Sequence, residues 1–141
     1  MAKYDDASWH YEGEYPDEQP EEGGATRIGL FLAWAIRRGL LSELHRHQRP
    51  EAVAAVTARA LTGAEFLLRE CDEELTDEDL NAEGNRFAVW HYEDRYLEDY
   101  AELFADDDGV ETLYHVQDTW ESYDRLERVL DRRFSEWRQG L

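Results

Sequence analysis

The chain has 141 residues, with 34 acidic and 15 basic side chains, and a formal net charge of −19 at pH 7. A composition that is 42% apolar and includes 18 aromatic rings excludes a disordered chain, and this length predicts a single domain over residues 1–141. The negative charge argues against direct binding to nucleic acid or to an anionic membrane surface, and the single cysteine excludes an internal disulfide.

Segment 1–24 combines acids with aromatic rings, and Pro16 and Pro20 disfavour a regular helix there. Rings of this size and number are typical of packed structure rather than of a loose tail. We therefore predict an acidic, aromatic arm, residues 1–24, that packs on a helical body formed by residues 25–141. The first residues contain no apolar signal-peptide core, which favours a cytoplasmic protein.

Segment 25–41 gives the strongest structural signal in the chain. Between Ile28 and Ile36 only the indole of Trp34 can form a side-chain hydrogen bond, so a helix here is apolar on every side and belongs in the core. Two glycines precede it, and Gly39 suits a left-handed residue at its C-terminal end. Its roughly four turns are too short to cross a bilayer, which takes about 20 residues.

Small residues recur every fourth position in this helix, at Ala25, Gly29 and Ala33. Residues four apart lie on one side of a helix, and small side chains let another backbone come close. We expect a second element to pack tightly against this stripe.

Start signals predict the helices that follow. Ser42, Thr62 and Thr76 can each cap a first turn, and Glu65 completes a capping box with Thr62. Pro50 suits the first position of a helix. The predicted helical segments are 42–47, 50–61, 62–74 and a short one from 76 to 84.

The spacing of apolar residues predicts that the C-terminal third of the chain is mostly helical. Segment 85–96 is ambiguous: Phe87, Val89 and His91 alternate with Ala88, Trp90 and Tyr92, which fits a strand. A helix that continues to Tyr96 fits almost as well, helical spacing follows to Phe104, and we favour a helix. Segment 110–116 is predicted to be a short extended piece. Asp118 is the expected N-cap of a last helix that Gly140 ends. Its apolar side would consist of Trp120, Tyr123, Leu126, either Val129 or Leu130, Phe134 and Trp137. The predicted fold is an all-α single compact domain of five to seven helices around the buried apolar helix.

Catalytic signals are weak. The chain has no nucleophile elbow, no phosphate-binding glycine loop and no metal-ligand motif, and His45 and His47 would point apart on a helix. Cys71 lies within an apolar helical pattern, which favours an inert core thiol. We therefore predict no catalytic residue, no metal site and no cofactor. The alternative is a small metal-dependent hydrolase that uses His10 or His91 with nearby acids.

One four-residue sequence, Trp-His-Tyr-Glu, occurs at 9–12 and again at 90–93, each time followed by another tyrosine and by acids. Aromatic rings usually pack, so one interpretation is core packing in both copies. The other is that both copies contribute to one recognition surface, because Trp and Tyr surrounded by charge are typical interface anchors. The candidate partner-binding residues are Trp9, His10, Tyr11, Glu12, Tyr15, Trp90, His91, Tyr92, Glu93, Asp94 and Tyr96.

The charge is distributed unevenly along the chain. The net charge is −7 over residues 1–24, +4 over 25–69, −15 over 70–111 and −1 over 112–141. Acid concentrated in two blocks predicts that the protein presents an acidic side to its partners.

Four stretches resemble a family of small acidic bacterial proteins of unknown function. They are YDDASWHYEG from Tyr4, GATxIGxFLAW from Gly24, CDExLTDEDL from Cys71 and VQDTWExY from Val116. The resemblance covers nearly the whole chain and implies no catalytic residue. In size and style the chain is also similar in character to immunity proteins of bacterial toxin systems.

The leading hypothesis is therefore a cytoplasmic immunity protein that neutralises a basic toxin by direct binding. Carboxylates would speed encounter with the basic partner, and aromatic rings would hold the complex. Besides the hydrolase, the alternative is a DNA-mimic inhibitor of a nucleic-acid-binding protein.

Overall fold

The computed structural model describes residues 3–7, 22–106 and 116–140. They form one compact, mostly helical domain with a small two-stranded sheet, as the all-α prediction requires. Within these residues the elements are β1 (Lys3–Asp6), α2 (Glu22–Arg37), α3 (Glu43–Gln48), α4 (Pro50–Thr57), α5 (Gly63–Glu70), β2 (Glu74–Thr76), α6 (Ala82–Trp90), α7 (Tyr96–Phe104) and α8 (Trp120–Arg138).

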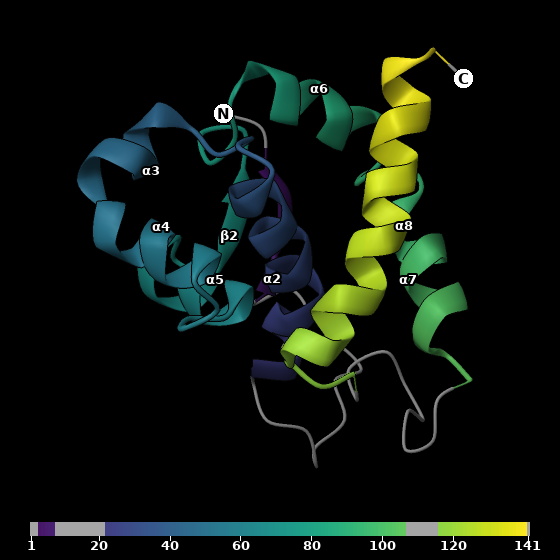
Figure 1. Ribbon diagram of the computed structural model, residues 1–141, viewed down its shortest axis with the longest axis horizontal. Helices are drawn as coiled ribbons and strands as arrows, with labels where there is room; N and C mark the ends of the chain where they lie inside the picture. Colours follow the sequence, from purple (N-terminus) through teal and green to yellow (C-terminus); the bar gives the residue numbers. More distant parts are fainter. Residues whose placement is uncertain (1–2, 8–21, 107–115, 141) are drawn as a thin grey trace.

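Helix α2 is the core helix that its sequence predicts. It lies between α4 and α5 on one side and α8 on the other (Figure 1), and every residue from Ile28 to Ile36 is buried. The indole of Trp34 donates to the Asp131 carboxylate of α8 over 2.9 Å. The one side chain between Ile28 and Ile36 that can form a hydrogen bond therefore has a partner although it is buried.

The C-terminal end of α2 agrees with the prediction, and its N-terminal end does not. Gly39 has a φ of +77°, and the amides of Gly39 and Leu40 bond to the carbonyls of Ile36 and Ala35, which confirms the left-handed C-terminal residue. The predicted start at Ala25 is wrong, because the helix already begins at Glu22 and includes both glycines. Burial of the following turns offsets the unfavourable helix propensity of glycine, about 1 kcal/mol each.

The small-residue stripe of α2 receives the start of α5. A Cβ atom placed on Gly63 would lie 1.8 Å from the carbonyl oxygen of Gly29, and one placed on Gly29 would lie 2.2 Å from the amide nitrogen of Ala64. These separations are far below any contact that real Cβ atoms make. The two backbones therefore touch, which confirms the close approach that the stripe predicts.

Helices α3 to α5 begin where their capping residues predict. The Ser42 hydroxyl accepts from the amide of His45, and Thr62 and Glu65 form both bonds of the capping box. Helices α4 and α5 end at Thr57 and Glu70, about four residues earlier than predicted. The chain then turns through left-handed residues, Arg59 after α4 and Asp72 and Glu73 after α5.

The predicted helix from Thr76 is wrong. Residues Glu74–Thr76 form β2, which pairs antiparallel with β1, so that Lys3 lies opposite Thr76 and Asp6 opposite Glu74. The Asp79 carboxylate still accepts from the Thr76 amide over 2.8 Å, as in a capping pattern. Here that bond closes a turn rather than starting a helix, because β1 holds the preceding residues extended.

The prediction of helix over segment 85–96 is confirmed as far as Trp90. Helix α6 begins after Asn81, whose side chain accepts from the amide of Gly84, so Gly84 lies inside the helix rather than at an end. Between α6 and α7 the carbonyl of His91 accepts from the amides of Arg95 and Tyr96. The continuous helix predicted across 91–95 is therefore wrong, and this turn gives α7 a direction of its own.

Helix α8 has the apolar side that its spacing predicts, with Tyr123, Leu126, Leu130 and Phe134 buried. Its N-cap is Thr119, not Asp118; the Asp118 carboxylate instead accepts from the Thr62 hydroxyl over 2.7 Å and ties the start of α8 to α5. The predicted extended piece at 110–116 lies almost wholly outside the described residues. None of the described helices is long and apolar enough to cross a membrane.

Candidate functional site

The candidate partner-binding residues of the first Trp-His-Tyr-Glu copy, Trp9, His10, Tyr11, Glu12 and Tyr15, lie outside the described residues. The neighbouring strand β1 is described and is held firmly. Its Asp5 carboxylate accepts from the hydroxyl of Tyr92 over 2.6 Å and from the guanidinium of Arg27 over 3.1 Å. The second copy thus anchors the strand that leads into the first.

The second copy divides into buried and surface residues. His91, Tyr92 and Tyr96 are at most 7% exposed, and their rings pack in the aromatic core around Phe31 and Phe87. Burial raises the pKa of both phenols, so each hydroxyl remains a hydrogen-bond donor at neutral pH. In this structure the side chains of these three residues support the fold.

The surface part of the second copy consists of Trp90, Glu93 and Asp94. Glu93 and Asp94 are exposed, and Trp90 is half-buried with the guanidinium of Arg95 stacked 4.2 Å from its ring centre. Arg95 also donates to the Trp90 carbonyl. A cation held on a tryptophan face in this way is less available to neutralise the carboxylates beside it.

A buried ionic network lies beneath this turn. The Asp99 carboxylate of α7 receives two bonds from the Arg133 guanidinium of α8, at 2.8 and 2.9 Å, and lies 2.8 Å from Nε2 of His91. His91 is fully buried, and its Nδ1 atom has no hydrogen-bond partner among the described residues. Burial lowers the pKa of His91 despite the bond to Asp99, and Arg133 together with His91 lowers the pKa of Asp99 against its own burial.

These shifts predict that stability falls in mild acid. The unfolded chain binds a proton at His91 as the pH falls below about 6.5, whereas the folded ring stays neutral, so the free energy of unfolding decreases from there downward. Asp99 causes a further loss of stability only when the pH falls below 3.8, the ordinary pKa of an aspartate. Urea titrations between pH 7 and 5 should show that the free energy of unfolding of the native sequence decreases as the pH falls. The His91→Gln variant should not show this pH dependence.

His47, which is exposed on α3, supplies the control. His47→Gln removes a histidine of ordinary surroundings and should keep the pH dependence of the native sequence. An equal pH dependence in the native sequence and in His91→Gln would contradict the assignment.

Helix α7 and the turn before it carry an acidic surface, which we define by Glu93, Asp94, Glu98, Glu102 and Asp106. All five side chains are exposed, and none forms an ion pair with a described residue. Leu97 of α7, which is 52% exposed, adds an apolar side chain to this helix, and Val89 of α6 is 53% exposed. This combination is the surface feature closest to the predicted recognition site.

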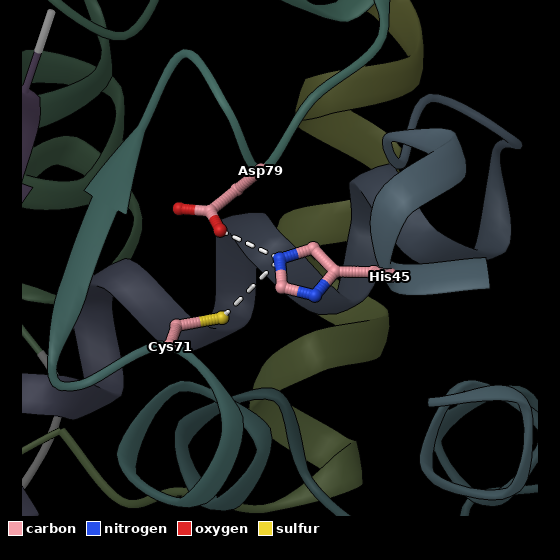
Figure 2. Close-up of side chains that lie close together, drawn as sticks. All are labelled: His45, Cys71 and Asp79. Carbon is pink, nitrogen blue, oxygen red and sulfur yellow. Dashed lines mark hydrogen bonds and ion pairs between the residues drawn. The ribbon is translucent and has the colours of Figure 1, made fainter. Parts of the chain in front are cut away.

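A second cluster, which the sequence did not reveal, lies on the other side of α2. His45 of α3, Cys71 at the end of α5 and Asp79 after β2 point toward one another from three separate segments (Figure 2). Nε2 of His45 lies 2.6 Å from Oδ1 of Asp79 and 3.8 Å from Sγ of Cys71. All three side chains are buried.

This cluster is not arranged as a nucleophile with its base. A triad needs the nucleophile and the orienting carboxylate on opposite ring nitrogens, but here both approach Nε2 of His45. Burial and the charge of Asp79 also raise the pKa of Cys71, so its thiol stays protonated. The interpretation of Cys71 as an unreactive thiol therefore agrees with its surroundings.

The comparisons with known proteins give a family but no activity. Residues 3–116 match the model of the family described as "Domain of unknown function (DUF7832)". The chain belongs to this family. The DUF7832 match spans β1 to α7 and ends before α8, although α8 covers the core. No curated protein and no solved structure matches the chain.

Proposed function

We propose that the protein is a stoichiometric binding module that holds a basic protein partner on the acidic surface of α7. The observation that carries this proposal is that none of the five exposed carboxylates forms an ion pair with any residue that the structure describes. Arg95 is the only basic residue in segment 93–106, and it is stacked on Trp90. A basic partner would supply the missing charge and be steered toward this side.

The charge arrangement works against the helix itself. Glu98 and Glu102 are one turn apart on α7, and like charges at this spacing destabilise a helix by about 0.2–0.5 kcal/mol. The last turn of α7 contains no basic residue of its own, and its one described cation is Arg125 of α8, which donates to the Leu103 carbonyl. Glu102 and the following Asp106 add negative charge at this negative end of the helix dipole, which is unfavourable. Glu98 lies in the first turn, where an acid favours the helix, but local stability does not explain Glu102 and Asp106, whereas binding to a basic surface does.

Leu97 and Val89 add the apolar contact that such a complex needs. Interfaces combine a desolvated apolar centre with a polar rim, and charge complementarity acts mainly on the rate of association. The most concrete form of the proposal is a cytoplasmic bacterial immunity protein that occludes a basic toxin. The acidic surface would then face the substrate-binding side of the toxin.

A charge reversal separates binding from stability. Glu102→Lys converts the repulsive pair with Glu98 into an attractive one and places a cation near the end of α7, so the free energy of unfolding should rise by about 0.5–1 kcal/mol. The same change should weaken partner binding by about tenfold or more. Urea denaturation and affinity capture from the native host, followed by titration of the captured protein at several salt concentrations, measure the two effects.

The matched control is Glu78→Lys, which makes the same change in charge at an exposed position of the turn after β2. It should bind within about threefold of the native sequence, because Glu78 is not one of the five acids of the surface and long-range charge effects are screened by salt. A Glu102→Lys protein that is stabilised and still captures every partner of the native protein would contradict the proposal, and solubility would then account for the acidity.

A further inference from the structure

The His45, Cys71 and Asp79 cluster has the donor atoms of a metal site, and it is separate from the proposed partner surface. An imidazole nitrogen, a thiol sulfur and a carboxylate oxygen all lie within 4.8 Å of one another. Figure 2 shows them converging on one point from α3, from the end of α5 and from the turn after β2. Nitrogen and sulfur donors with one carboxylate are typical of zinc and similar divalent transition metals.

One of the three donor separations is already close to that around a tetrahedral ion. With zinc–nitrogen and zinc–sulfur bonds of about 2.0 and 2.3 Å, the two donor atoms lie about 3.5 Å apart. In the structure Nε2 of His45 and Sγ of Cys71 are 3.8 Å apart. The His45–Asp79 separation of 2.6 Å is a hydrogen bond and would have to lengthen to about 3.3 Å. The Asp79 carboxylate would have to rotate about its second oxygen, Oδ2, which accepts from the Thr76 amide.

Charge balance also favours a divalent ion. A buried ion is stable only when neighbouring charges compensate it. One thiolate from Cys71 and one carboxylate from Asp79 neutralise a dication, and neutral His45 adds no charge. The cluster would therefore carry no net charge with the metal bound.

The contacts of Arg49 indicate which ring nitrogen of His45 carries the hydrogen and where an ion could enter the cluster. Its Nη1 atom donates to Nδ1 of His45 over 3.2 Å, so the ring hydrogen is on Nε2 and points to Asp79. The same arginine lines a surface depression of about 400 Å³ with Gln48 and Glu70. Movement of Arg49 away from the ring would open that side and let Nδ1 carry the hydrogen.

We propose that His45 Nε2, Cys71 Sγ and Asp79 Oδ1 bind one divalent transition-metal ion of the zinc type, with a solvent molecule as the fourth ligand. The imidazole hydrogen moves from Nε2 to Nδ1, the thiol gives its proton to solvent, and Asp79 binds as a carboxylate. Binding therefore releases one proton for each metal ion and involves no oxidation or reduction. The ion fastens the turn after β2 to α3 and α5.

The test uses the full chain and the metal alone, with three variants. Zn²⁺ should bind one per chain to the native protein, release one proton, and raise the melting temperature by about 5 °C or more at a hundredfold excess over Kd. Co²⁺ should give a thiolate-to-cobalt absorption band that Cys71→Ala abolishes. Cys71→Ala removes only weak polar contacts and should fold, and it should lose the thermal shift, as should His45→Gln.

The matched control is His47→Gln, which removes an exposed histidine two residues from His45. It should bind zinc, and zinc should raise its melting temperature as much as it does for the native protein. A native protein with no thiolate band, or a thermal shift that remains unchanged in Cys71→Ala, would overturn the proposal. The three residues would then be a hydrogen-bonded structural cluster.

Discussion

Gly63→Ala is expected to lower the free energy of unfolding by at least about 3 kcal/mol. The new methyl group would lie 1.8 Å from the carbonyl oxygen of Gly29 and 2.9 Å from the side chain of Ala33. The first obstacle is backbone, which cannot rotate away as a flexible side chain could, so α2 and α5 have to separate along their contact. Urea denaturation followed by circular dichroism measures the loss.

Two comparisons test that this loss comes from helix separation. Gly140→Ala meets no atom within 4 Å and has a φ of +78°, so it should lose only the strain of a left-handed residue, about 1–2 kcal/mol. The double variant Gly29→Ala with Gly63→Ala should lose much less than the sum of the two single losses, because the helices separate only once. A loss below about 1 kcal/mol in Gly63→Ala would show that the contact is not tight.

Arg133→Met should cost about 3 kcal/mol, even though methionine can keep much of the apolar contact of the arginine stem. The change leaves the Asp99 carboxylate, 4% exposed, without the two bonds from the guanidinium and with only His91 as a partner. A carboxylate that stays charged in that position has lost most of what compensated its desolvation. Thermal and urea unfolding at pH 7 measure the effect.

The same helix offers the control. Arg132 is 63% exposed and pairs only loosely with Glu136, at 3.9 Å, so Arg132→Met should change stability by less than about 0.5 kcal/mol. Adding Asp99→Asn to Arg133→Met should recover much of the loss, because the amide needs no counterion and its oxygen can still accept from His91. Equal losses in the single and double variants would show that the buried charge is not the cause.

The local part of the fold could be predicted because its causes are local. An apolar run between glycines places α2 in the core, and Ser42 and Thr62 cap their helices through bonds that span three residues. The period of α8 gives its buried side for the same reason. Each of these signals lies within a few turns of the residue that it describes.

The predictions are wrong where the local structure depends on contacts with residues that are distant in the sequence. Thr76 has a sound helix-start pattern, but β1 lies about 70 residues earlier and holds it in a strand. The break at His91 depends on packing between α6, α7 and α8. The spacing of residue types along the sequence predicts neither the pairing of β1 with β2 nor the packing around His91.

The candidate sites show the same limit. Helical spacing could show that the rings near residue 92 pack, yet a repeated four-residue sequence could not show which rings face inward. His45, Cys71 and Asp79 are 26 and 8 residues apart along the chain, which matches no metal motif. Their one common signal is that each lies at or near the end of an element, where side chains of different elements meet.

The position of α8 makes the core depend on a helix that lies outside the family match. Phe134 lies against the rings of Trp34 and Phe87, and Trp137 also contacts Phe87, so α8 covers large buried aromatic side chains. A fragment that ends at residue 116, the boundary of the family match, would expose those rings to water. We therefore expect such a fragment to bind chaperones or aggregate rather than to fold as a small domain.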